Sequence, residues 1–255
     1  MHQTERARHF ASLHVRGNPL ILYNAWDAGS AKAIAASGAP AIATSSWAVA
    51  AAHGYEDGES IPLPFVEQIL ARVIAAVDVP VSVDVEGGYS HDPDGAARNV
   101  ARLVEVGAVG INFEDRIVSG TGLHPIDVQC RRIAAIRRMA DARGISLFIN
   151  ARTDIYLGTG IAAADGLAEA RARAAAYADA GASGFFVPGL VELPAIAALC
   201  DTIKLPVNVM WMPRLPEVRA LADAGVARVS HGSAAYDQAM EAVRAAAQAA
   251  LSSTV

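Results

Sequence analysis

The sequence predicts an α/β fold in which eight parallel strands, each followed by a helix, close into a single (β/α)8 TIM barrel. Short apolar strands alternate with longer amphipathic helices along the chain, which is typical of parallel βαβ units. The length of 255 residues fits one barrel better than two ordinary domains. A hydrophobic content of 53% with only 6% aromatic residues suits helices that pack on a buried parallel sheet.

Four of the eight expected strands follow a helix that ends in a glycine. Glycine suits this position because it tolerates the left-handed backbone conformation that ends a helix. These glycines are Gly38, Gly107, Gly181 and Gly225. Two other strands are entered through proline, one follows Gly144, and one begins the series. The expected strands are 20–23, 41–44, 77–85, 110–113, 145–151, 184–187, 205–210 and 227–230.

Helical patterns fill the intervals between these strands. The whole of 1–255 is predicted to form one domain, with 1–17 as an N-terminal helical extension and 233–251 as the C-terminal helix. An open doubly wound sheet is the alternative, but its GxGxxG phosphate-binding turn is absent after the first strand. The expected helices are about 27–37, 62–77, 93–106, 127–143, 161–180, 190–201, 214–224 and 233–251.

Charge and cysteine content argue against several classes of function. The net charge is -5 and no run of Lys or Arg is present, so nucleic acid is not an expected partner. The first seventeen residues do not resemble a secretory signal, and no run of eighteen apolar residues predicts a membrane span. Cys130 and Cys200 show no disulfide or zinc-site spacing, which favours the reducing cytoplasm.

Acidic residues gather where the third and fourth strands end, which is the end of a barrel where active sites lie. Asp84 and Glu86 are two residues apart on one strand and so share a face, and Glu114 ends the next strand. Three carboxylates without a matching lysine repel one another unless a cation joins them. Oxygen ligands of this kind suit Mg²⁺, or Mn²⁺ in its place. Solvated loop carboxylates are the alternative interpretation.

The second and fifth strands end in residues that suit an anionic substrate. Arg152 would bind a carboxylate or phosphonate through its planar fork of N–H groups. A structural arginine paired with Glu114 or Asp154 is the alternative. The backbone N–H groups of the turn 45–47 would hold a carboxylate or oxyanion.

These motifs, in this order, resemble the isocitrate lyase/phosphoenolpyruvate mutase superfamily over roughly 23–231. Residues 84–89 read Asp-Val-Glu-Gly-Gly-Tyr, similar to the family's D-x-D-x-G-Y. Glu114 and Asp115 match its E-D pair, and 150–154 match its A-R-T/V-[DE] motif. The turn 45–47 falls on the family's S-G-G/L turn, and Asp57 falls on its aspartate twelve residues later.

The resemblance implies a Mg²⁺ ion held by Asp84 directly, and by Glu86 and Glu114 directly or through water. A small 2-oxo acid would complete the metal shell, and its carboxylate would meet the N–H groups of Ser46 and Trp47. The metal and Arg152 would stabilise the negative charge that develops on oxygen. The expected catalytic residues are Asp57, Arg152 and His124. The expected substrate contacts are Tyr23, Ser45, Ser46, Trp47, Asp84, Asn112, Arg152, Met210 and His231.

The chain also departs from the family. The loop 116–125 lacks the cysteine of the lyases' K-[KR]-C-G-H and the K-T-N of the mutase and hydrolase branch, and Asn112 stands where the lyases carry a histidine. His124 is the one titratable residue left in that loop apart from Arg116, and an imidazole suits a general acid or base near pH 7. A histidine on the loop surface is the alternative.

The primary hypothesis is a Mg²⁺-dependent lyase that cleaves a carbon–carbon bond in a small 2-oxo or 2-hydroxy dicarboxylic acid through an enolate. The expected reaction is similar to that of oxaloacetate decarboxylase, or to that of dimethylmalate or methylisocitrate lyase. A carbon–phosphorus enzyme, similar to phosphoenolpyruvate mutase or phosphonopyruvate hydrolase, is one alternative, and a catalytically weak 2-oxo-acid-binding protein is another. In the resembling family the last helix is exchanged between subunits, which predicts a homodimer or homotetramer. A helix packed on its own barrel is the alternative.

Overall fold

The computed structural model describes residues 2–157 and 163–252, and in this part of the chain eight parallel strands form one sheet. They are β1 (Leu20–Leu22), β2 (Ile42–Ala43), β3 (Val81–Asp84), β4 (Gly110–Glu114), β5 (Phe148–Arg152), β6 (Gly184–Phe186), β7 (Val207–Met210) and β8 (Arg228–Ser230). The order in the sheet is β1-β8-β7-β6-β5-β4-β3-β2. The barrel closes just beyond the strands, where Ala25 forms a parallel bridge with Thr44. The predicted (β/α)8 barrel is confirmed.

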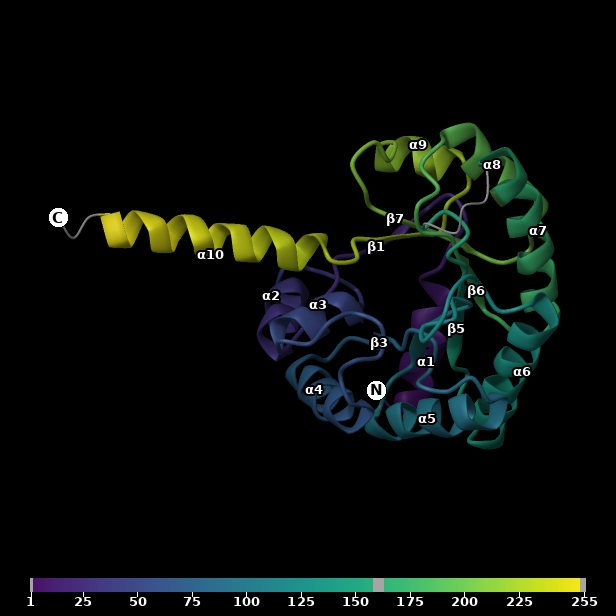
Figure 1. Ribbon diagram of the computed structural model, residues 1–255, viewed down its shortest axis with the longest axis horizontal. Coiled ribbons are helices and arrows are strands. Elements are labelled where there is room, and N and C mark those ends of the chain that lie inside the picture. The colour runs from purple at the N-terminus through teal and green to yellow at the C-terminus, as the bar shows by residue number, and fades with distance from the viewer. Residues whose placement is uncertain (1, 158–162, 253–255) are drawn as a thin grey trace.

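Helices surround the sheet, as Figure 1 shows. Those in the described residues are α1 (Gln3–Ser12), α2 (Ala28–Ala36), α3 (Ser46–Ala52), α4 (Leu63–Ala76), α5 (Pro93–Val106), α6 (Ile126–Ala142), α7 (Ala163–Asp179), α8 (Leu193–Thr202), α9 (Val218–Asp223) and α10 (Ala234–Ser252). The four predicted helix-ending glycines, Gly38, Gly107, Gly181 and Gly225, all have positive φ. Residues 1, 158–162 and 253–255 of the expected single domain lie outside the described part, and these include the first two residues of the helix expected at 161–180.

The structure corrects the expected starts of two strands and adds one helix. Strand β3 begins at Val81 rather than at 77, because α4 ends at Ala76 and Pro80, which has no N–H to donate, precedes the strand. Strand β5 begins at Phe148 rather than at 145, because the N–H of Leu147 turns back to the carbonyl of Ile145. Helix α3 was not expected, since 45–47 was interpreted as a turn only.

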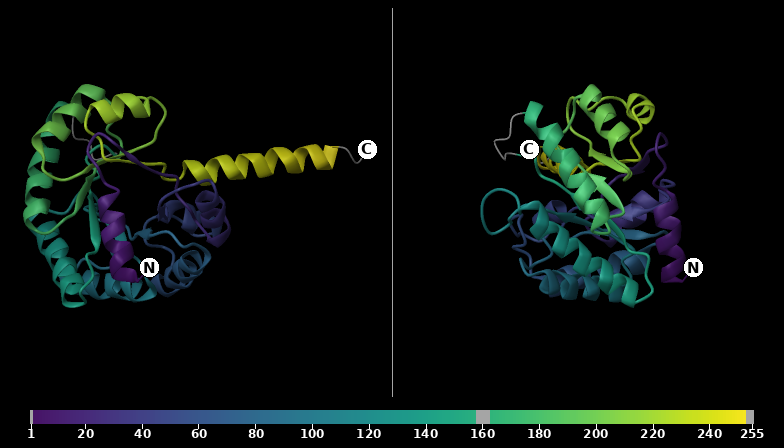
Figure 2. Two further views of the ribbon diagram at one scale, coloured as in Figure 1. Left: turned by 180° about the vertical axis from the view of Figure 1, so that it is seen from behind. Right: turned by 90° about the vertical axis from the view of Figure 1, so that its right-hand side faces the viewer.

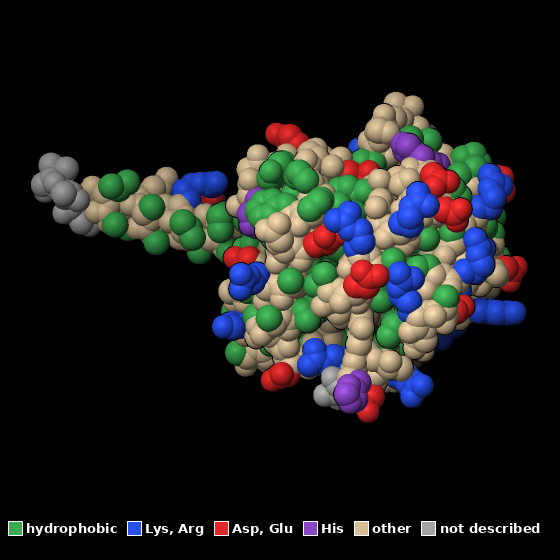
Figure 3. All heavy atoms as spheres, turned by 90° about the horizontal axis from the view of Figure 1, so that it is seen from below, with side chains coloured by type: hydrophobic (Ala, Val, Ile, Leu, Met, Phe, Trp, Pro, Cys, Tyr) green, Lys and Arg blue, Asp and Glu red, His purple; other side chains and the backbone are tan. Residues whose placement is uncertain are grey.

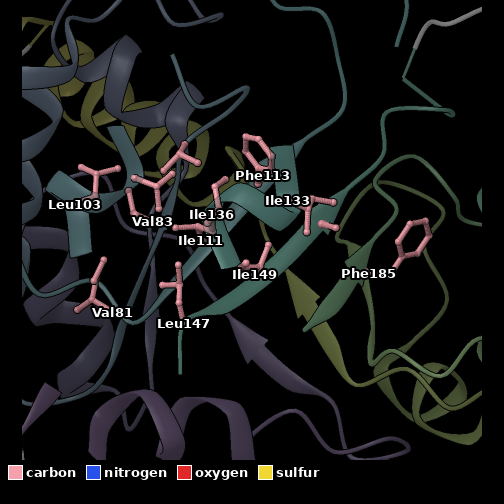
Figure 4. Close-up of a cluster of buried hydrophobic side chains, with 14 of the residues drawn as sticks. Val81, Val83, Leu103, Ile111, Phe113, Ile133, Ile136, Leu147, Ile149 and Phe185 are labelled. Atoms are coloured by element: carbon pink, nitrogen blue, oxygen red, sulfur yellow. The ribbon is translucent and has the colours of Figure 1, made fainter. Parts of the chain in front are cut away.

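The main hydrophobic core lies between the outer face of the sheet and the helices that cover it. Figure 4 shows Val83, Ile111 and Ile149 of the strands packed close to Ile133 and Ile136 of α6. These side chains are fully buried or nearly so, and burial of each contributes about 1.5–3 kcal/mol. This packing holds the strands in register, so the carboxyl ends of all strands point to the same rim.

Helix α1 covers the opposite, amino-terminal end of the barrel (Figure 2). Phe10 of α1 is fully buried and meets the ring of Phe148 edge-on at 5.5 Å between centroids. His14 stacks on the same ring at 3.9 Å, and its Nδ1 lies 2.9 Å from the carbonyl oxygen of Phe10. An apolar plug therefore seals this end, and the polar residues of the barrel open toward the other.

Helix α10 leaves the barrel and projects from it (Figure 1). From Glu241 to Leu251 its side chains are exposed, and hydrophobic groups recur along the projecting rod in Figure 3. Val243 and Leu251 are 60% and 75% exposed, which is unusual for large apolar residues. None of the helices in the described part of the chain is long and apolar enough to cross a membrane.

Candidate active site

A cavity of about 170 Å³ opens at the carboxyl ends of the strands, where barrel enzymes place their active sites. Residues from the ends of all eight strands line it, so distant parts of the sequence converge there. A larger hollow of about 630 Å³ lies outside the barrel beside β1 and α2 and has no charged lining residue. The smaller cavity is therefore the candidate active site. Its lining residues are Asn24, Ser45, Ser46, Trp47, Asp57, Asp84, Asn112, Arg152, Phe186, Met210, Ser230, Gly232 and Ser233.

Asp84 lies at the end of β3 with one oxygen held and the other free. Its Oδ2 accepts hydrogen bonds from the backbone N–H of Ser46, at 3.3 Å, and from the Ser46 hydroxyl, at 3.0 Å. The backbone N–H of Asp84 is bound to Thr44 Oγ1 at 3.0 Å. Oδ1 is buried and has no hydrogen-bond partner among the described residues. A buried carboxylate oxygen without a partner is costly, so it marks a position suited to a cation.

Two other carboxylates face the same region. Both oxygens of Glu86 accept the backbone N–H of Glu59 at 3.0 Å. Burial, and then the charges of Asp57 and Asp84, raise the pKa of Glu86 to about 8. Burial and Asp84 likewise raise the pKa of Asp57, which lines the cavity. The negative charges thus repel one another, as the sequence predicts for carboxylates that lack a counterion.

Arg152 is held between two buried carboxylates. Its Nε and Nη2 donate to the two oxygens of Asp154, at 2.6 and 2.9 Å, and its Nη1 lies 3.0 Å from Glu114 Oε2. Burial alone would lower the pKa of Arg152, but Glu114 and Asp154 outweigh it and raise that pKa. Burial is also the main cause that raises the pKa of Glu114. The structural pairing with both carboxylates is therefore present, and the guanidinium still lines the cavity.

Asp115 ties the end of β4 to its neighbours. It is fully buried, and its Oδ2 accepts hydrogen bonds from Arg173 Nη1, at 3.0 Å, and from the Tyr177 hydroxyl, at 2.8 Å. Its Oδ1 accepts the backbone N–H of Asp154 at 3.2 Å. The second acid of the Glu-Asp motif thus positions the strand end that carries Arg152, and it does not face the cavity.

The carboxylates by themselves do not enclose a metal ion. Across residues 2–157 and 163–252, no three His, Cys, Asp or Glu side chains converge closely enough to do so. Glu86 and Glu114 are turned toward Glu59 and Arg152, whereas Asp84 Oδ1 has no partner in the described residues. Mg²⁺ binds in many sites through one or two carboxylates and keeps several waters. The donor set fits an ion bound directly by Asp84, with the two glutamates reached through water.

The walls of the cavity combine polar and apolar groups. Ser45 caps α3 by accepting the N–H of Ala48. The Ser46 N–H was expected to bind the carboxylate of a substrate, but it donates to Asp84 Oδ2 instead. Trp47, Phe186 and Met210 supply the apolar lining. Phe186 was not singled out from the sequence, because one aromatic residue in a buried strand has no distinguishing signal.

The barrel interior below the cavity is polar, which the sequence reasoning missed. Asn112 Oδ1 accepts hydrogen bonds from Asn150 Nδ2, at 2.9 Å, and from Arg228 Nη2, at 3.2 Å. Arg228 Nε also donates to Ser230 Oγ at 3.0 Å. Arg228 is fully buried. A signal existed, since a charged residue that begins a short apolar strand is unusual.

Three predicted site residues lie elsewhere. His124 lines a separate small cavity together with Glu59 and Arg132, and burial lowers its pKa to about 4. The Tyr23 hydroxyl donates to Gln238 of α10, and the Tyr23 ring borders the outer hollow. His231 stacks on Trp211 at 5.8 Å between ring centroids and is not part of the cavity lining. Strand-end position alone did not reveal which way these side chains turn.

Fold and site together define an α/β-barrel enzyme with an acidic, arginine-containing cavity. A family model described as phosphoenolpyruvate phosphomutase matches residues 10–251. The chain belongs to this family and thereby to the isocitrate lyase/phosphoenolpyruvate mutase superfamily of Mg²⁺-dependent lyases and mutases, so the predicted membership is confirmed. Its homologues are enzymes, which supports a lyase or mutase activity for this chain.

Individual relatives agree with this assignment. An uncharacterised protein of Mycobacterium tuberculosis is 38% identical over 240 residues, covering 94% of this chain and 88% of the relative. The 2-methylisocitrate lyase of Escherichia coli is 28% identical over 203 residues, covering 78% and 67%. The solved structure of an inferred phosphonomutase from Burkholderia cenocepacia J2315 has a TM-score of 0.94 at 44% identity and covers 97% of this chain and 99% of its own.

Proposed function

We propose that this protein is a Mg²⁺-dependent lyase that cleaves a carbon–carbon bond in a small 2-oxo or 2-hydroxy dicarboxylic acid, with an oxaloacetate-like acid as the best candidate. The observation that carries the proposal is the buried Asp84 Oδ1, which has no hydrogen-bond partner in the described part of the chain and lies beside carboxylates of raised pKa, so that it fits a bound cation. Mn²⁺ suits the same oxygen ligands. A phosphonopyruvate hydrolase with the same fold was solved with oxalate and Mg²⁺ bound, and a 29% identical relative from Pseudomonas putida is an oxaloacetate decarboxylase.

The size of the cavity supports a small substrate. A volume of about 170 Å³ is smaller than the ~300–1,000 Å³ of typical ligand pockets. This suits an acid of a few carbon atoms better than a nucleotide. Arg152, Ser46 and Asn112 place polar groups around this space, and an anionic substrate would bind among them.

The side chains of the cavity have distinct proposed roles. Arg152 would orient a carboxylate or the carbonyl oxygen of the substrate, held in place by Glu114 and Asp154. Trp47 and Met210 would exclude water from the reacting carbon. A Mg²⁺ ion bound here would supply the positive charge that stabilises an oxygen anion during cleavage.

A proton must be supplied when the carbon–carbon bond breaks, and Asp57 is the proposed carrier. It lines the cavity, and its raised pKa lets the carboxyl group keep a proton at a higher pH than an ordinary aspartate would. His124 was the candidate from the sequence, but it lies in the separate small cavity with Glu59 and Arg132. The proposal therefore rests on Asp57 rather than on the loop histidine.

The decisive experiment is a substrate comparison. Purified protein with Mg²⁺ is incubated with oxaloacetate, 2-methylisocitrate, 2,3-dimethylmalate and phosphonopyruvate, and pyruvate, other 2-oxo acids and phosphate are measured. Turnover of one of the first three, lost on chelation with EDTA, is expected. Turnover of phosphonopyruvate alone would establish the carbon–phosphorus alternative instead. Binding of these acids without any turnover would establish a 2-oxo-acid-binding protein.

The proposed metal ligand is tested by Asp84→Asn, which keeps the shape of the side chain. Calorimetric titration of Mg²⁺ is expected to lose at least about tenfold in affinity, because a neutral amide replaces the carboxylate that has the free oxygen. Asp223→Asn on exposed α9 is the matched control and should bind as the wild type does. An unchanged Mg²⁺ affinity in Asp84→Asn would remove the ligand assignment.

A carbon–phosphorus activity is the second candidate, and one observation favours it. The matching family model is described as a phosphoenolpyruvate phosphomutase, and the 44% identical Burkholderia structure is an inferred phosphonomutase. Arg152 suits a phosphonate as well as a carboxylate. The loop 116–125 nevertheless lacks the Lys and Asn of the mutase and hydrolase branch, so carbon–carbon cleavage remains the first proposal.

Exchange of α10 between subunits of a homodimer or homotetramer is also part of the proposal. Helix α10 projects away, while the outer hollow of about 630 Å³ beside β1 is lined by Leu20, Ile21 and Ile34, of which Ile21 is exposed. A partner's α10 would bury its own apolar residues in this hollow. Cys130 and Cys200 are both free thiols, which supports the cytoplasm as the proposed compartment.

A further inference from the structure

Arg228 is a buried cation that the proposed reaction does not yet use. It begins β8, is fully buried, and reaches across the barrel interior to Asn112 of β4. Within the described residues no carboxylate forms an ion pair with it, and its Nη1 has no hydrogen-bond partner. Its other bonds go to Asn112 and Ser230, and both of these residues line the active-site cavity.

The contact with Arg228 determines which atom of the Asn112 amide faces the cavity. An arginine side chain only donates hydrogen bonds, so the atom of Asn112 that it meets must be the oxygen. This Oδ1 accepts from Arg228 Nη2 at 3.2 Å and from Asn150 Nδ2 at 2.9 Å. The opposite atom, Nδ2, is not among the buried atoms that lack a partner, although no described residue accepts from it. Asn112 therefore presents N–H donors to the cavity.

Ser230 is controlled in the same way. Its Oγ accepts hydrogen bonds from Arg228 Nε, at 3.0 Å, and from Asn208 Nδ2, at 3.1 Å. With two donors on this oxygen, the hydroxyl hydrogen must point to another acceptor. The acceptor present is Asn208 Oδ1 at 3.3 Å, a long hydrogen bond that a bound anion would outcompete.

We infer that Arg228 is a positioning residue that turns Asn112 and Ser230 into a floor of hydrogen-bond donors, and that this floor binds a carboxylate or enolate oxygen of the substrate. The inference rests on the proposed function. It deepens that function by naming Asn112 and Ser230 as the groups that bind the anionic oxygen of the substrate. The donors are neutral, and the N–H groups of Asn112 are fixed before the substrate arrives, so they stabilise an oxygen anion without a cost of reorganisation. The Ser230 hydroxyl has only to turn from Asn208 Oδ1 to the anion.

A purely structural role for Arg228 is the competing explanation. Burial lowers the pKa of Arg228 to about 9, opposed by the charge of Asp84, so the guanidinium remains charged at neutral pH. A buried cation without a paired anion stabilises a fold poorly compared with an apolar side chain of similar size. A structural arginine would also leave ligand affinity unaffected once stability is accounted for, and this separates the two explanations.

The first test is Asn112→Asp, with 3,3-difluorooxaloacetate, a four-carbon 2-oxo diacid, as the probe and Mg²⁺ present. The new carboxylate still accepts from Arg228 and Asn150, so the melting temperature should not fall. It no longer donates to the cavity, so calorimetry should show affinity lower by about 10- to 100-fold. Unchanged affinity would overturn the donor floor.

The second test replaces the positioning residue. Arg228→Met should weaken binding of the probe by about tenfold, and Arg228→Lys should recover part of that loss because a lysine restores a donor-only cation. Arg137→Met is the matched control, since Arg137 donates to Gly181, Leu147 and Ser183 at the opposite end of the barrel. If affinity in these three variants simply follows melting temperature, the positioning role is overturned.

The same titrations distinguish this inference from the proposed function. Mg²⁺-dependent binding that survives unchanged in Asn112→Asp and Arg228→Met leaves the metal-dependent function standing and removes the donor floor. Binding by the wild type that needs no Mg²⁺ but is lost in Asn112→Asp leaves the floor standing and removes the metal. A wild type that does not bind the probe at millimolar concentration removes both.

Discussion

At the scale of single residues, removal from water decides how the titratable groups of this protein behave. Burial and neighbouring carboxylates raise the pKa of Glu86, and partial desolvation and Asp84 raise the pKa of Asp57, whereas Asp154 forms an ion pair with Arg152. Two aspartates of the same region thus have opposite environments, since Asp57 lies near another carboxylate and Asp154 near a guanidinium. The sequence shows which acids end the strands, but their pKa values depend on neighbours that only the fold supplies.

His14 offers a pH prediction at this scale. Burial, and then the charge of Arg228, lower the pKa of His14 from 6.5 to about 3. Below pH 6.5 the unfolded chain binds a proton there that the folded protein refuses, so stability present above pH 6.5 is lost as the pH falls toward 3. In His14→Phe this part of the pH dependence should vanish. Urea unfolding at pH 7.5 and pH 5 measures it.

Exposed His9 provides the comparison, since His9→Phe should leave the difference between pH 7.5 and pH 5 as it is in the wild type. An equal loss of stability on acidification in His14→Phe and in the wild type would contradict the assignment to His14. The site carboxylates titrate identically in all three proteins, so they cancel in the comparison.

At the scale of elements, glycines end the helices and ion pairs hold their ends in place. Gly38 and Gly181 end α2 and α7 with φ of 92° and 101°. A Cβ at Gly38 would meet nothing within 4 Å, whereas one at Gly181 would lie 2.8 Å from Arg137 Cγ. The two glycines therefore share a backbone requirement but differ in crowding.

This difference predicts the cost of two alanine substitutions. Gly38→Ala should lower the free energy of unfolding by about 1–2 kcal/mol, which is the cost of a left-handed conformation for an L-residue. Gly181→Ala should cost more, because the arginine side chain must also move. Chemical denaturation of both variants measures the order, and a larger loss in Gly38→Ala would refute the explanation by crowding.

The contact between β4 and α7 carries another prediction. Arg173 pairs with fully buried Asp115, so Arg173→Met leaves an uncompensated charge and should cost about 3–5 kcal/mol of unfolding free energy. The double variant Arg173→Met/Asp115→Asn should recover part of this loss, because the unpaired charge is gone. Thermal and urea unfolding of the two proteins check it, and a double variant no more stable than the single one would argue against an electrostatic cause.

At the scale of the whole molecule, the projecting helix α10 and the outer hollow beside β1 both expose apolar side chains. Val243 and Leu251 are exposed on α10, and Ile21 is exposed on β1 beside the hollow. Large apolar side chains exposed in this way are typical of association surfaces. Strands of a barrel are normally buried by a layer of helices, and the exposed Ile21 on β1 lacks such cover.

Assembly is therefore expected to depend on α10. The wild type should run as a dimer or tetramer in light scattering coupled to size exclusion, and Val243→Glu/Leu251→Glu should shift it toward the monomer, because two charges cannot be buried in an apolar hollow. Ala245→Glu, which adds a charge to the opposite face of the same helix, serves as the control. A monomeric wild type would refute the exchange of α10.

The fold was largely predictable because its signals are local. Helix-ending glycines such as Gly107 and Gly225 and the alternation of apolar segments predicted all eight strands. The errors in β3 and β5 arose where a proline or a turn delays a strand by a few residues. Helix α3 was missed because seven residues carry too little periodicity to distinguish a short helix from a turn.

The sequence by itself determined the barrel, the superfamily and the residues that end each strand, because these follow from periodicity and from short contiguous motifs. Only the tertiary structure decided which of those side chains meet. It brought Asp57, Asp84 and Arg152 to one cavity, placed His124 in another, and put Arg228 beneath Asn112. The physical reason is that the direction of a side chain beyond the end of a strand depends on hydrogen bonds and burial among residues far apart in the chain, and no local pattern encodes those contacts.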